Sequence, residues 1–458
     1  MSTRDDGTTL APGVARRVAG AAAIGNFMEW FDFAVYGFFA VTIGKVFFPS
    51  DSDTASLLSS LAVYGVAFLV RPVGGLVLGA YGDRAGRRAA LSLTVVLMGI
   101  STTLVAVLPT YDSVGFLAPV LLIALRCAQG FSAGGEWTGT SAFLVEYAPK
   151  HRRALWGSVV SATAALGTLA GALVALTLST ALTEAQLLSW GWRIPFLLAA
   201  PLGAIGLYVR LRLEDTPVYR ELQEAHEVSA KPLQESARKN RRAIGLVMAS
   251  ASISGLGYYY LGSYVITYLT ETVEVERTTA LGIVASGIAC YALLCPCAGL
   301  LSDRIGRRPS VLMGCAGLAV VSVPLMVLLA TGAPAPAVLG IALFGVFQAL
   351  VNVNGVVILV ELFPARSRVS SSAIGYNLGL ALIAGPGPLI AAALAAATDG
   401  GVTPGLYVVA VALVAGIVLS LWLPETRGRS LREEPRFRRD AEPATAAVKP
   451  AATVARSS

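Results

Sequence analysis

Acidic side chains in an apolar stretch near the start of the chain are the first candidates for chemistry. Spacings of three and four residues place Glu29, Asp32 and Tyr36 on one face of a helix. A carboxylate at membrane depth costs several kcal/mol if it faces lipid, so this face should meet a water-filled cavity or a partner. We therefore expect Glu29 and Asp32 to carry protons, and Tyr36 to contact a solute bound there.

A second polar face follows in the stretch 114–146. Arg126, Gln129 and Glu136 recur there at helical spacing, with glycines between them. An arginine at such a site can clamp a carboxylate, and a buried acid can take up and release a proton. We expect Glu136 to carry a proton, although it could instead be a fixed partner for a neighbouring helix. We expect Arg126, Gln129 and Trp137 to contact the solute.

Arg71 is a third ionisable group within an apolar run. It lies eleven residues before the loop GDRAGRR (82–88), or roughly 17 Å along a helix. This places it at about the depth of Glu29 and Asp32. Two interpretations stay open: a structural ion pair with these acids, or a pair that titrates during a transport cycle. We assign Arg71 to gating.

Tyrosines dominate the stretch 257–268. Tyr260, Tyr264 and Tyr268 are spaced by four residues, which stacks them on one helical face. Aromatic faces hold an alkylated ammonium group by cation–π attraction, worth about 2 kcal/mol or more when desolvated. The alternative is an interfacial belt or helix packing. Later polar groups at membrane depth either ligate a solute or bond neighbouring helices; they are Gln348, Asn352, Asn354, Tyr376 and Asn377. We assign Tyr260, Tyr264, Asn352 and Tyr376 to solute binding.

Neither a cofactor nor a metal is expected from the remaining motifs. The five cysteines all fall inside apolar stretches, where a thiol behaves as a small apolar side chain. The pair Cys295 and Cys297 matches no metal-ligand or redox spacing. The sequence contains no GxxxxGK(S/T) phosphate loop and no nucleophile–base constellation. We therefore expect no enzyme activity, while a channel or a transporter-like sensor stays open.

The chain is far more apolar than a soluble globular protein. Of its 458 residues, 55% are hydrophobic and 14% are charged. Apolar runs of about 18 or more residues recur, and each can cross a hydrocarbon layer of about 30 Å. We predict an all-α membrane protein with twelve transmembrane helices. The expected spans are 18–43, 55–80, 89–109, 114–146, 154–182, 191–212, 243–270, 278–301, 309–331, 336–361, 370–397 and 404–423.

The net charge of +7 reflects membrane topology. In the twelve-span arrangement, thirty Lys and Arg residues fall on one side of the membrane and three on the other. This positive-inside bias predicts that both termini lie in the cytoplasm. We expect a multi-pass protein of the cell (inner or plasma) membrane. Its partners would be the lipid bilayer, protons and a small-molecule substrate, with no nucleic acid and no obligate protein partner.

An internal repeat organises the chain. The loop GDRAGRR (82–88) returns as SDRIGRR (302–308), 220 positions later, and the segment 146–153 returns as 361–368, 215 positions later. A repeat of this length indicates the doubling of a unit of about 200 residues. We expect two six-helix bundles with a linker and two tails. The expected boundaries are 1–17 (cytoplasmic tail), 18–212 (first bundle), 213–242 (cytoplasmic linker), 243–423 (second bundle) and 424–458 (cytoplasmic tail).

Several long motifs resemble one family of membrane proteins. They are GNFMEWFDFAVYG (25–37), RPVGGLVLGAYGDRAGRR (71–88), RCAQGFSAGGEWTG (126–139), WGWRIPF (190–196) and LLSDRIGRR (300–308). Through them the chain resembles the major facilitator superfamily over about 18–425, and in particular its metabolite:proton symporter family. GKVFFP (44–49) and the tyrosine-rich segment make it most similar to the bacterial proline/glycine betaine symporters.

This resemblance implies a pseudo-symmetric fold of six plus six helices, alternating access, and uptake driven by a proton gradient. It also implies charge contacts at the cytoplasmic helix ends that hold one conformation closed. The residues in those contacts would be Asp83, Arg87, Arg88, Asp303, Arg307 and Arg308. Osmosensing relatives often carry a long C-terminal coiled coil, but 424–458 has no heptad pattern, so no coiled coil is expected here.

These expectations combine into a proton-coupled symporter that imports a small zwitterion such as proline or glycine betaine. Protonation of Glu136 or Asp32 would neutralise a buried charge and ease the inward-facing switch. Arg126 would hold the carboxylate of the substrate, and aromatic groups would face its cationic end. The alternative keeps this mechanism and changes the substrate to a small organic acid, such as oxoglutarate, citrate or a shikimate-like acid.

Overall fold

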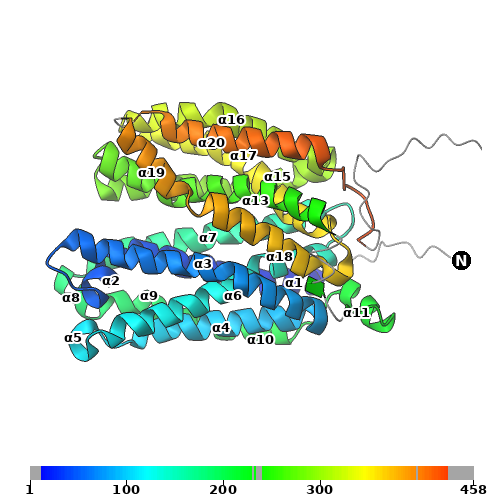
Figure 1. Ribbon diagram of the computed structural model, residues 1–458, viewed down its shortest axis with the longest axis horizontal. Helices are drawn as coiled ribbons and strands as arrows, with labels where there is room; N and C mark the ends of the chain where they lie inside the picture. The colour runs from blue at the N-terminus through cyan, green and yellow to red at the C-terminus, as the bar shows by residue number, and fades with distance from the viewer. Residues whose placement is uncertain (1–11, 230–231, 234–239, 399–400, 432–458) are drawn as a thin grey trace, which may run out of the picture.

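The computed structural model describes residues 12–229, 232–233, 240–398 and 401–431. Within these residues the chain is helical and has no strand, which confirms the predicted fold class. Figure 1 shows long helices running side by side in two groups, the first half of the chain below and the second half above. We call these groups the first and the second bundle. The expected tails are described only from residue 12 and up to residue 431.

The first bundle is built from the elements that precede the linker. They are α1 (Pro12–Phe38), α2 (Ala40–Phe47), α3 (Asp53–Ala85), α4 (Arg87–Val107), α5 (Tyr111–Val114), α6 (Leu117–Tyr147), α7 (Arg153–Ala181), α8 (Glu184–Ser189), η1 (Gly191–Arg193), α9 (Ile194–Leu197) and α10 (Ala199–Leu211). A short helix, α11 (Pro217–Glu224), lies in the linker.

The second bundle contains three π-helical turns among its α-helices. Its elements are α13 (Arg241–Tyr259), η2 (Tyr260–Tyr264), α14 (Val265–Thr267), η3 (Tyr268–Thr272), α15 (Arg277–Ile305), α16 (Arg307–Ala330), α17 (Pro334–Glu361), η4 (Ala365–Ser367), α18 (Arg368–Gly379), η5 (Leu380–Ala384), α19 (Gly387–Ala397) and α20 (Thr403–Trp422). The π-helical turns are η2, η3 and η5.

The number of spans agrees with the twelve predicted. Within the described residues, eleven helices are long and apolar enough to cross a membrane, or twelve if one bent pair counts as a single span. That pair is Arg17–Phe38 with Ala40–Phe47, and its two parts meet at 67°. The single span predicted for 18–43 therefore missed a break. Gly37, whose backbone is freer than that of other residues, lies just before it.

Glycines let α3 and α6 approach each other closely. A Cβ atom on Gly74 would overlap the backbone of Phe131, and one on Gly134 would overlap that of Arg71. In a bilayer, such close packing is a main source of helix association, because lipid tails are as apolar as the side chains. The contact fixes the position of Arg71 relative to the polar face of α6.

One end of the molecule, which we call the basic end, gathers the loops rich in arginine. These loops are 82–88, 150–153, 302–308 and 366–368. The two copies of the repeated loop turn in the same way, at Gly86 (φ +102°) and Gly306 (φ +106°). Glycine adopts this conformation without the strain that a side chain would add. The bundles also touch along α3 with α18 and along α7 with α15 and α17.

Candidate functional site

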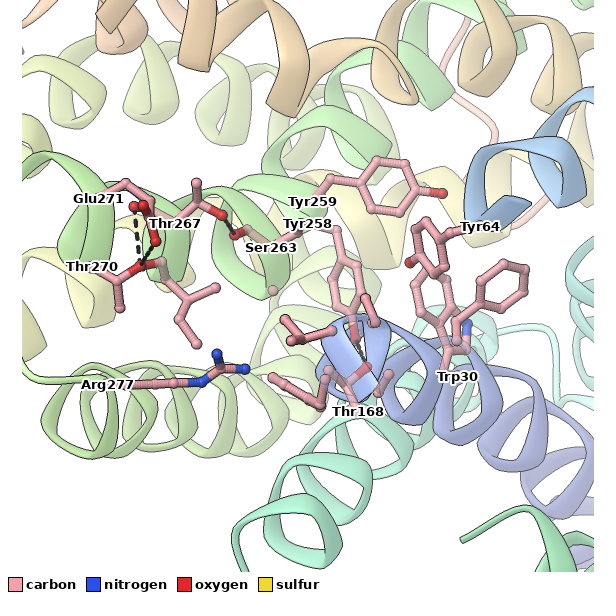
Figure 2. Close-up of a pocket in the computed structure, with 18 of the residues that line it drawn as sticks. Trp30, Tyr64, Thr168, Tyr258, Tyr259, Ser263, Thr267, Thr270, Glu271 and Arg277 are labelled. Atoms are coloured by element: carbon pink, nitrogen blue, oxygen red, sulfur yellow. Dashed lines mark hydrogen bonds between the residues drawn. The ribbon is translucent and has the colours of Figure 1, made fainter. Parts of the chain in front are cut away.

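A cavity of about 500 Å³ lies between the two bundles, toward the end away from the basic end (Figure 2). Residues of α1, α3 and α7 form one wall, and residues of α13, its π-helical continuation and the start of α15 form the other. The cavity reaches the surface at the exposed side chains Glu271 and Arg277. Aromatic and hydroxyl-bearing side chains dominate its deeper part: Trp30, Phe33, Tyr64, Thr168, Tyr258 and Tyr259.

Aromatic rings from both bundles meet at the inner edge of this cavity. Trp30 meets Tyr258 edge-on, with ring centroids 4.7 Å apart, and Trp137 stacks on Tyr376 with centroids 5.7 Å apart. Trp30 also contacts Trp137 at 6.0 Å, so the rings form a continuous layer. The Trp30 Nε1 and the Tyr259 hydroxyl have no hydrogen-bond partner among the described residues. Two polar atoms therefore remain for a bound solute or water.

Asp32 and Arg126 form a fully buried ion pair just behind the aromatic wall. Their closest atoms, Oδ2 and Nη1, are 2.9 Å apart, and Gln129 donates a second hydrogen bond to Asp32 at 2.8 Å. The Arg126 guanidinium lies 4.2 Å from the centre of the Tyr36 ring. Its Nε and Nη2 have no hydrogen-bond partner among the described residues. The guanidinium thus holds donors that an additional anion could use.

Two further ion pairs lie in the first bundle. Glu29 pairs with Arg71, which binds α1 to α3. Glu136 pairs with Arg210 of α10 at 2.5 Å and also accepts a hydrogen bond from the hydroxyl of Thr94. The Glu29 pair matches the open interpretation of a structural ion pair. The Glu136 pair matches the interpretation of a fixed partner for a neighbouring helix.

Arg210 is a site residue that sequence reasoning missed. It was one of the thirty basic residues assigned to one side of the membrane, because it lies at the polar end of an apolar run. It is only 2% exposed, and a Cβ atom on Gly25 would overlap its guanidinium. The available signal was Gly25, which lies one turn before Glu29 and leaves room for a large side chain from another helix.

The second bundle holds neutral polar groups at the depth where the first bundle has ion pairs. Gln348 donates to the carbonyl of Ser254 at 2.6 Å, and Asn377 donates to the carbonyl of Gly134 at 3.0 Å. Asn352 accepts a hydrogen bond of 3.3 Å from Ser161. These amides bond neighbouring helices, which was one of the two interpretations left open. Within the described residues, the ion pairs at membrane depth lie in the first bundle.

Two predicted substrate-binding tyrosines point away from the cavity. The hydroxyl of Tyr260 donates to the carbonyl of Pro404 at 2.8 Å, and that of Tyr264 donates to the carbonyl of Ala391 at 3.5 Å. Their rings lie in contact on one helical face, as the spacing predicted. They pack against α19 and α20 and do not line this cavity, and their assignment to solute binding stays a prediction. Tyr258 faces the cavity instead, because side chains two residues apart on a helix point to nearly opposite faces.

The remaining predicted substrate-binding residues lie close to the cavity but not in its wall. Tyr36 and Gln129 surround Arg126, and Tyr36 donates to the carbonyl of Ser60 at 3.2 Å. Beyond the aromatic layer there is a small pocket of about 10 Å³. Trp137, Asn352 and Tyr376 line it together with Ser250 and Ser254.

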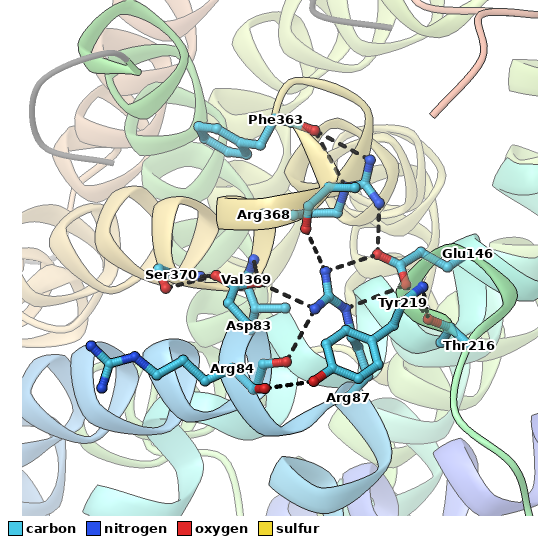
Figure 3. A network of polar contacts seen from close by, with 12 residues as sticks. Asp83, Arg84, Arg87, Glu146, Thr216, Tyr219, Phe363, Arg368, Val369 and Ser370 are labelled. Carbon is cyan, nitrogen blue, oxygen red and sulfur yellow. Dashed lines mark hydrogen bonds and ion pairs between the residues drawn. The ribbon is translucent and has the colours of Figure 1, made fainter. Parts of the chain in front are cut away.

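The basic end is closed by aspartates that reach from one bundle to the other, and Figure 3 shows the one from the first bundle, Asp83. Asp83 accepts hydrogen bonds from the backbone N–H groups of Val369 and Ser370, at 3.1 and 2.8 Å. Asp303 accepts equivalent bonds from Ala154 and Leu155, at 3.0 and 2.9 Å. Each carboxylate therefore caps the first turn of a helix in the opposite bundle, where unpaired N–H groups and the helix dipole favour negative charge.

Two glutamates add a second set of contacts at the basic end. Glu146 pairs with Arg87 of its own bundle and with Arg368 of the other, the latter at 2.6 Å. Glu361 pairs with Arg307 at 3.2 Å and with Arg153 at 3.4 Å. We predicted Arg87 and Arg307 for these contacts and missed their partners. The signal was present, because all four partners fall in the repeated segments 146–153 and 361–368.

Two residues assigned to the contacts at the basic end, Arg88 and Arg308, bond elsewhere, whereas Arg71 lies at the expected depth. Arg88 donates to the carbonyl of Leu211 at 3.0 Å and Arg308 to that of Ser420 at 2.7 Å, both within their own bundle. Their guanidinium groups therefore do not bridge the bundles. Arg71 lies deep in the first bundle with Glu29, far along α3 from the basic end.

Asp215 anchors the turn between α3 and α4. It accepts hydrogen bonds from the backbone N–H groups of Arg87 and Arg88, at 3.1 and 3.2 Å. Burial raises the pKa of the Asp215 carboxyl above its usual range, while the hydrogen bonds and the charge of Arg87 oppose the rise. Glu425 makes the matching bonds to Arg307 and Arg308 in the second bundle, at 3.0 and 3.1 Å.

Comparison with known proteins agrees with this geometry. The family model of the Major Facilitator Superfamily matches residues 22–386 and 277–457. A solved structure of the proton:xylose symporter XylE bound to 6-bromo-6-deoxy-D-glucose has a TM-score of 0.77 and 19% identity, with 92% of this chain and 98% of that chain covered. At that identity the likeness concerns the fold.

Curated relatives are more similar in sequence. The proline/betaine transporter of Escherichia coli (strain K12) is 38% identical over 451 residues, with 94% of this chain and 87% of that protein covered. The glycine betaine/proline/ectoine/pipecolic acid transporter OusA of Dickeya dadantii (strain 3937) is 36% identical, with 93% and 87% covered. The resemblance found in the motifs is thereby confirmed, and the chain belongs to the Major Facilitator Superfamily of membrane transporters.

Proposed function

We propose that this transporter imports a small zwitterion with an alkylated ammonium group, such as glycine betaine or proline, together with protons. The observation that carries the proposal is the aromatic cavity beside the buried pair of Asp32 and Arg126. The relatives named for proline and betaine support this choice of substrate. The protein would lie in the cell membrane with its basic end and both termini in the cytoplasm, as the positive-inside bias predicts.

The cationic end of the substrate would lie among the rings of the cavity. Trp30, Tyr258 and Tyr259 come together there from the two bundles. A desolvated quaternary ammonium gains about 2 kcal/mol or more from such faces, without any formal negative charge. Both bundles would contact the same substrate molecule, so substrate binding would favour closing of the cavity between them.

Proton coupling would act through the pair of Asp32 and Arg126. When Asp32 takes a proton, the Arg126 guanidinium loses its buried counter-charge. An unpaired buried charge is costly, so the guanidinium then favours a new anion, and the carboxylate of the substrate can supply it. The unpartnered Nε and Nη2 of Arg126 support this step. Proton and substrate would therefore bind together rather than compete.

The transport cycle would separate the contacts at the basic end. We propose that 18–212 and 243–423 move as two units, joined by the linker 213–242. The conformation described above is closed at the basic end and hollow at the other, so it corresponds to the outward-facing state. Release to the cytoplasm would require Asp83 and Asp303 to leave the helices that they cap.

The proposal is tested by uptake into proteoliposomes that contain the purified protein. Radiolabelled glycine betaine should accumulate when the outside is made acidic, and a proton ionophore should abolish the accumulation. Unlabelled proline should compete strongly, whereas oxoglutarate and citrate should not. Strong competition by the two acids alone would replace the zwitterion with an organic acid. Uptake that ignores the proton gradient would contradict the coupling.

A further inference from the structure

The chain continues past α20 and crosses the basic end. Figure 1 shows this segment running from the end of α20 toward the first bundle. We call residues 427–431 the strap. The carbonyl of Arg429 accepts a hydrogen bond of 2.7 Å from Arg153, and the carbonyl of Leu431 accepts one of 2.7 Å from Arg368. The side chain of Leu431 is buried at 8% exposure and belongs to the apolar core.

The two arginines that bind the strap belong to different bundles. Arg153 begins α7 in the first bundle, and Arg368 begins α18 in the second. The accepting carbonyls of Arg429 and Leu431 are two residues apart, and an extended chain spans at most about 3.6 Å per residue. The strap can therefore bridge only a short distance between the two helix ends. If the bundles separate at the basic end, at least one of the two bonds must break.

The two residues just before the strap are fixed to the second bundle. Glu425 accepts the backbone N–H of Arg307 at 3.0 Å, and Thr426 donates to Glu361 at 2.5 Å. The bond from Arg153 therefore ties the first bundle to the strap. Arg153 makes a second contact across the bundles, with Glu361 at 3.4 Å.

The internal repeat accounts for Glu425 and Thr426, the residues before the strap, but not for the strap itself. In the first repeat Asp215 and Thr216 make the bonds that Glu425 and Thr426 make in the second. After Thr216, however, the chain enters α11 at Pro217. The second repeat instead continues as irregular chain between the two arginines. The strap thus breaks the pseudo-symmetry of the basic end.

We propose that residues 427–431 act as a latch on the closed basic end, which must release Arg153 before this end opens. The latch stabilises the conformation described here through the backbone carbonyls of Arg429 and Leu431. The proposal rests on alternating access, and it does not depend on which substrate is carried.

The test compares two shortened chains by the distance between spin labels. The labels are placed at His151 and Arg304, two exposed positions on different bundles at the basic end. The background is a full-length chain with its five cysteines replaced. One variant ends after Thr426 and lacks the strap; the matched control ends after Leu431 and keeps it. Pulsed electron paramagnetic resonance then measures the distances between the two labels in nanodiscs without substrate. The distribution of these distances gives the fraction of molecules in which the basic end is open.

The variant that ends after Thr426 should raise the ratio of open to closed molecules by about tenfold, the scale of one hydrogen bond to a charged group. The control should match the full-length chain. The full-length variant Leu431→Asp should also raise the ratio of open to closed molecules, because a carboxylate is costly to bury and the strap would leave its place. This variant provides the test if the short chain does not fold. Unchanged distances in both variants would overturn the latch. A failure of betaine uptake would bear on the proposed substrate alone, because no substrate is present in this measurement.

Discussion

At the scale of single residues, the first bundle pairs each buried acid with an arginine. Asp32, Glu29 and Glu136 each have such a partner, and each pair joins two helices. Removing one partner of a buried pair leaves an uncompensated charge, which costs more than removing both. The stabilities of the single and double variants therefore distinguish a pair that only holds helices together from one that exchanges protons.

The pair of Glu136 and Arg210 should behave as a structural pair. Glu136→Gln leaves Arg210 buried without its counter-charge, so it should destabilise the protein by about 3–5 kcal/mol. The double variant Glu136→Gln, Arg210→Met should recover most of this loss. Thermal unfolding in detergent measures both effects. If Glu136→Gln melts like the unaltered protein and loses only its proton dependence, Glu136 is a proton carrier instead.

The cavity offers a matched pair of tyrosines. Tyr258 lines the cavity, whereas Tyr260, two residues later, packs against α20. Tyr258→Leu should raise the KM for glycine betaine by about 10-fold to 30-fold, the equivalent of a lost cation–π contact of about 2 kcal/mol. Tyr260→Leu removes the same ring from the same helix and should change KM less than threefold. Equal effects of the two substitutions on KM would contradict this view of the site.

At the scale of helices, the repeated loops connect the bundles by capping. The backbone of Gly86 and Gly306 forms the same turn in both, and each loop presents an aspartate to the opposite bundle. The sequence allowed this pairing of loops to be predicted because the spacing of the motif is fixed. It could not identify α18 and α7 as the helices that are capped, since that depends on how the bundles dock.

Loss of either cap should favour opening of the basic end. Asp83→Ala and Asp303→Ala each remove bonds to helix N–H groups, worth about 1 kcal/mol, or about fivefold in the ratio of open to closed molecules. The double variant should show about the product of both effects, because the two sites share no partner. Spin labels at His151 and Arg304 measure this ratio.

Asp112→Ala is the control for the cap variants. Asp112 is exposed in the first turn of α5, away from the contacts between the bundles. Its removal should leave the distances between the labels unchanged. A shift of the same size in this control would mean that the distances respond to charge alone and not to capping.

Some of the site could not be read from helical spacing. Tyr260 and Tyr264 share one helical face as their spacing predicted, but that face packs against α19 and α20. Helical spacing shows which side chains share a face, whereas the partner of that face depends on how the helices dock. Arg210 was missed for another reason, because a charge at the end of an apolar run is ordinarily solvated.

At the scale of the whole molecule, the two bundles share a fold and differ in chemistry. Long apolar runs and the repeat were sufficient to predict an all-α membrane protein with about twelve spans, because a bilayer demands helices of defined length. Among the residues that the structure describes, the ion pairs at membrane depth lie in the first bundle, and the second contributes neutral amides and tyrosines. Under the proposed function, protonation would act on one bundle while the substrate contacts both.

We propose above that protonation of Asp32 releases Arg126 for the substrate and so couples proton transport to substrate transport. The most direct measurement compares concentrative uptake with exchange in proteoliposomes for Asp32→Asn. A side chain that cannot lose a proton should cut uptake driven by a pH gradient at least tenfold, while exchange of labelled for unlabelled glycine betaine at equal pH continues. Uptake that still follows the imposed gradient in Asp32→Asn would contradict the claim.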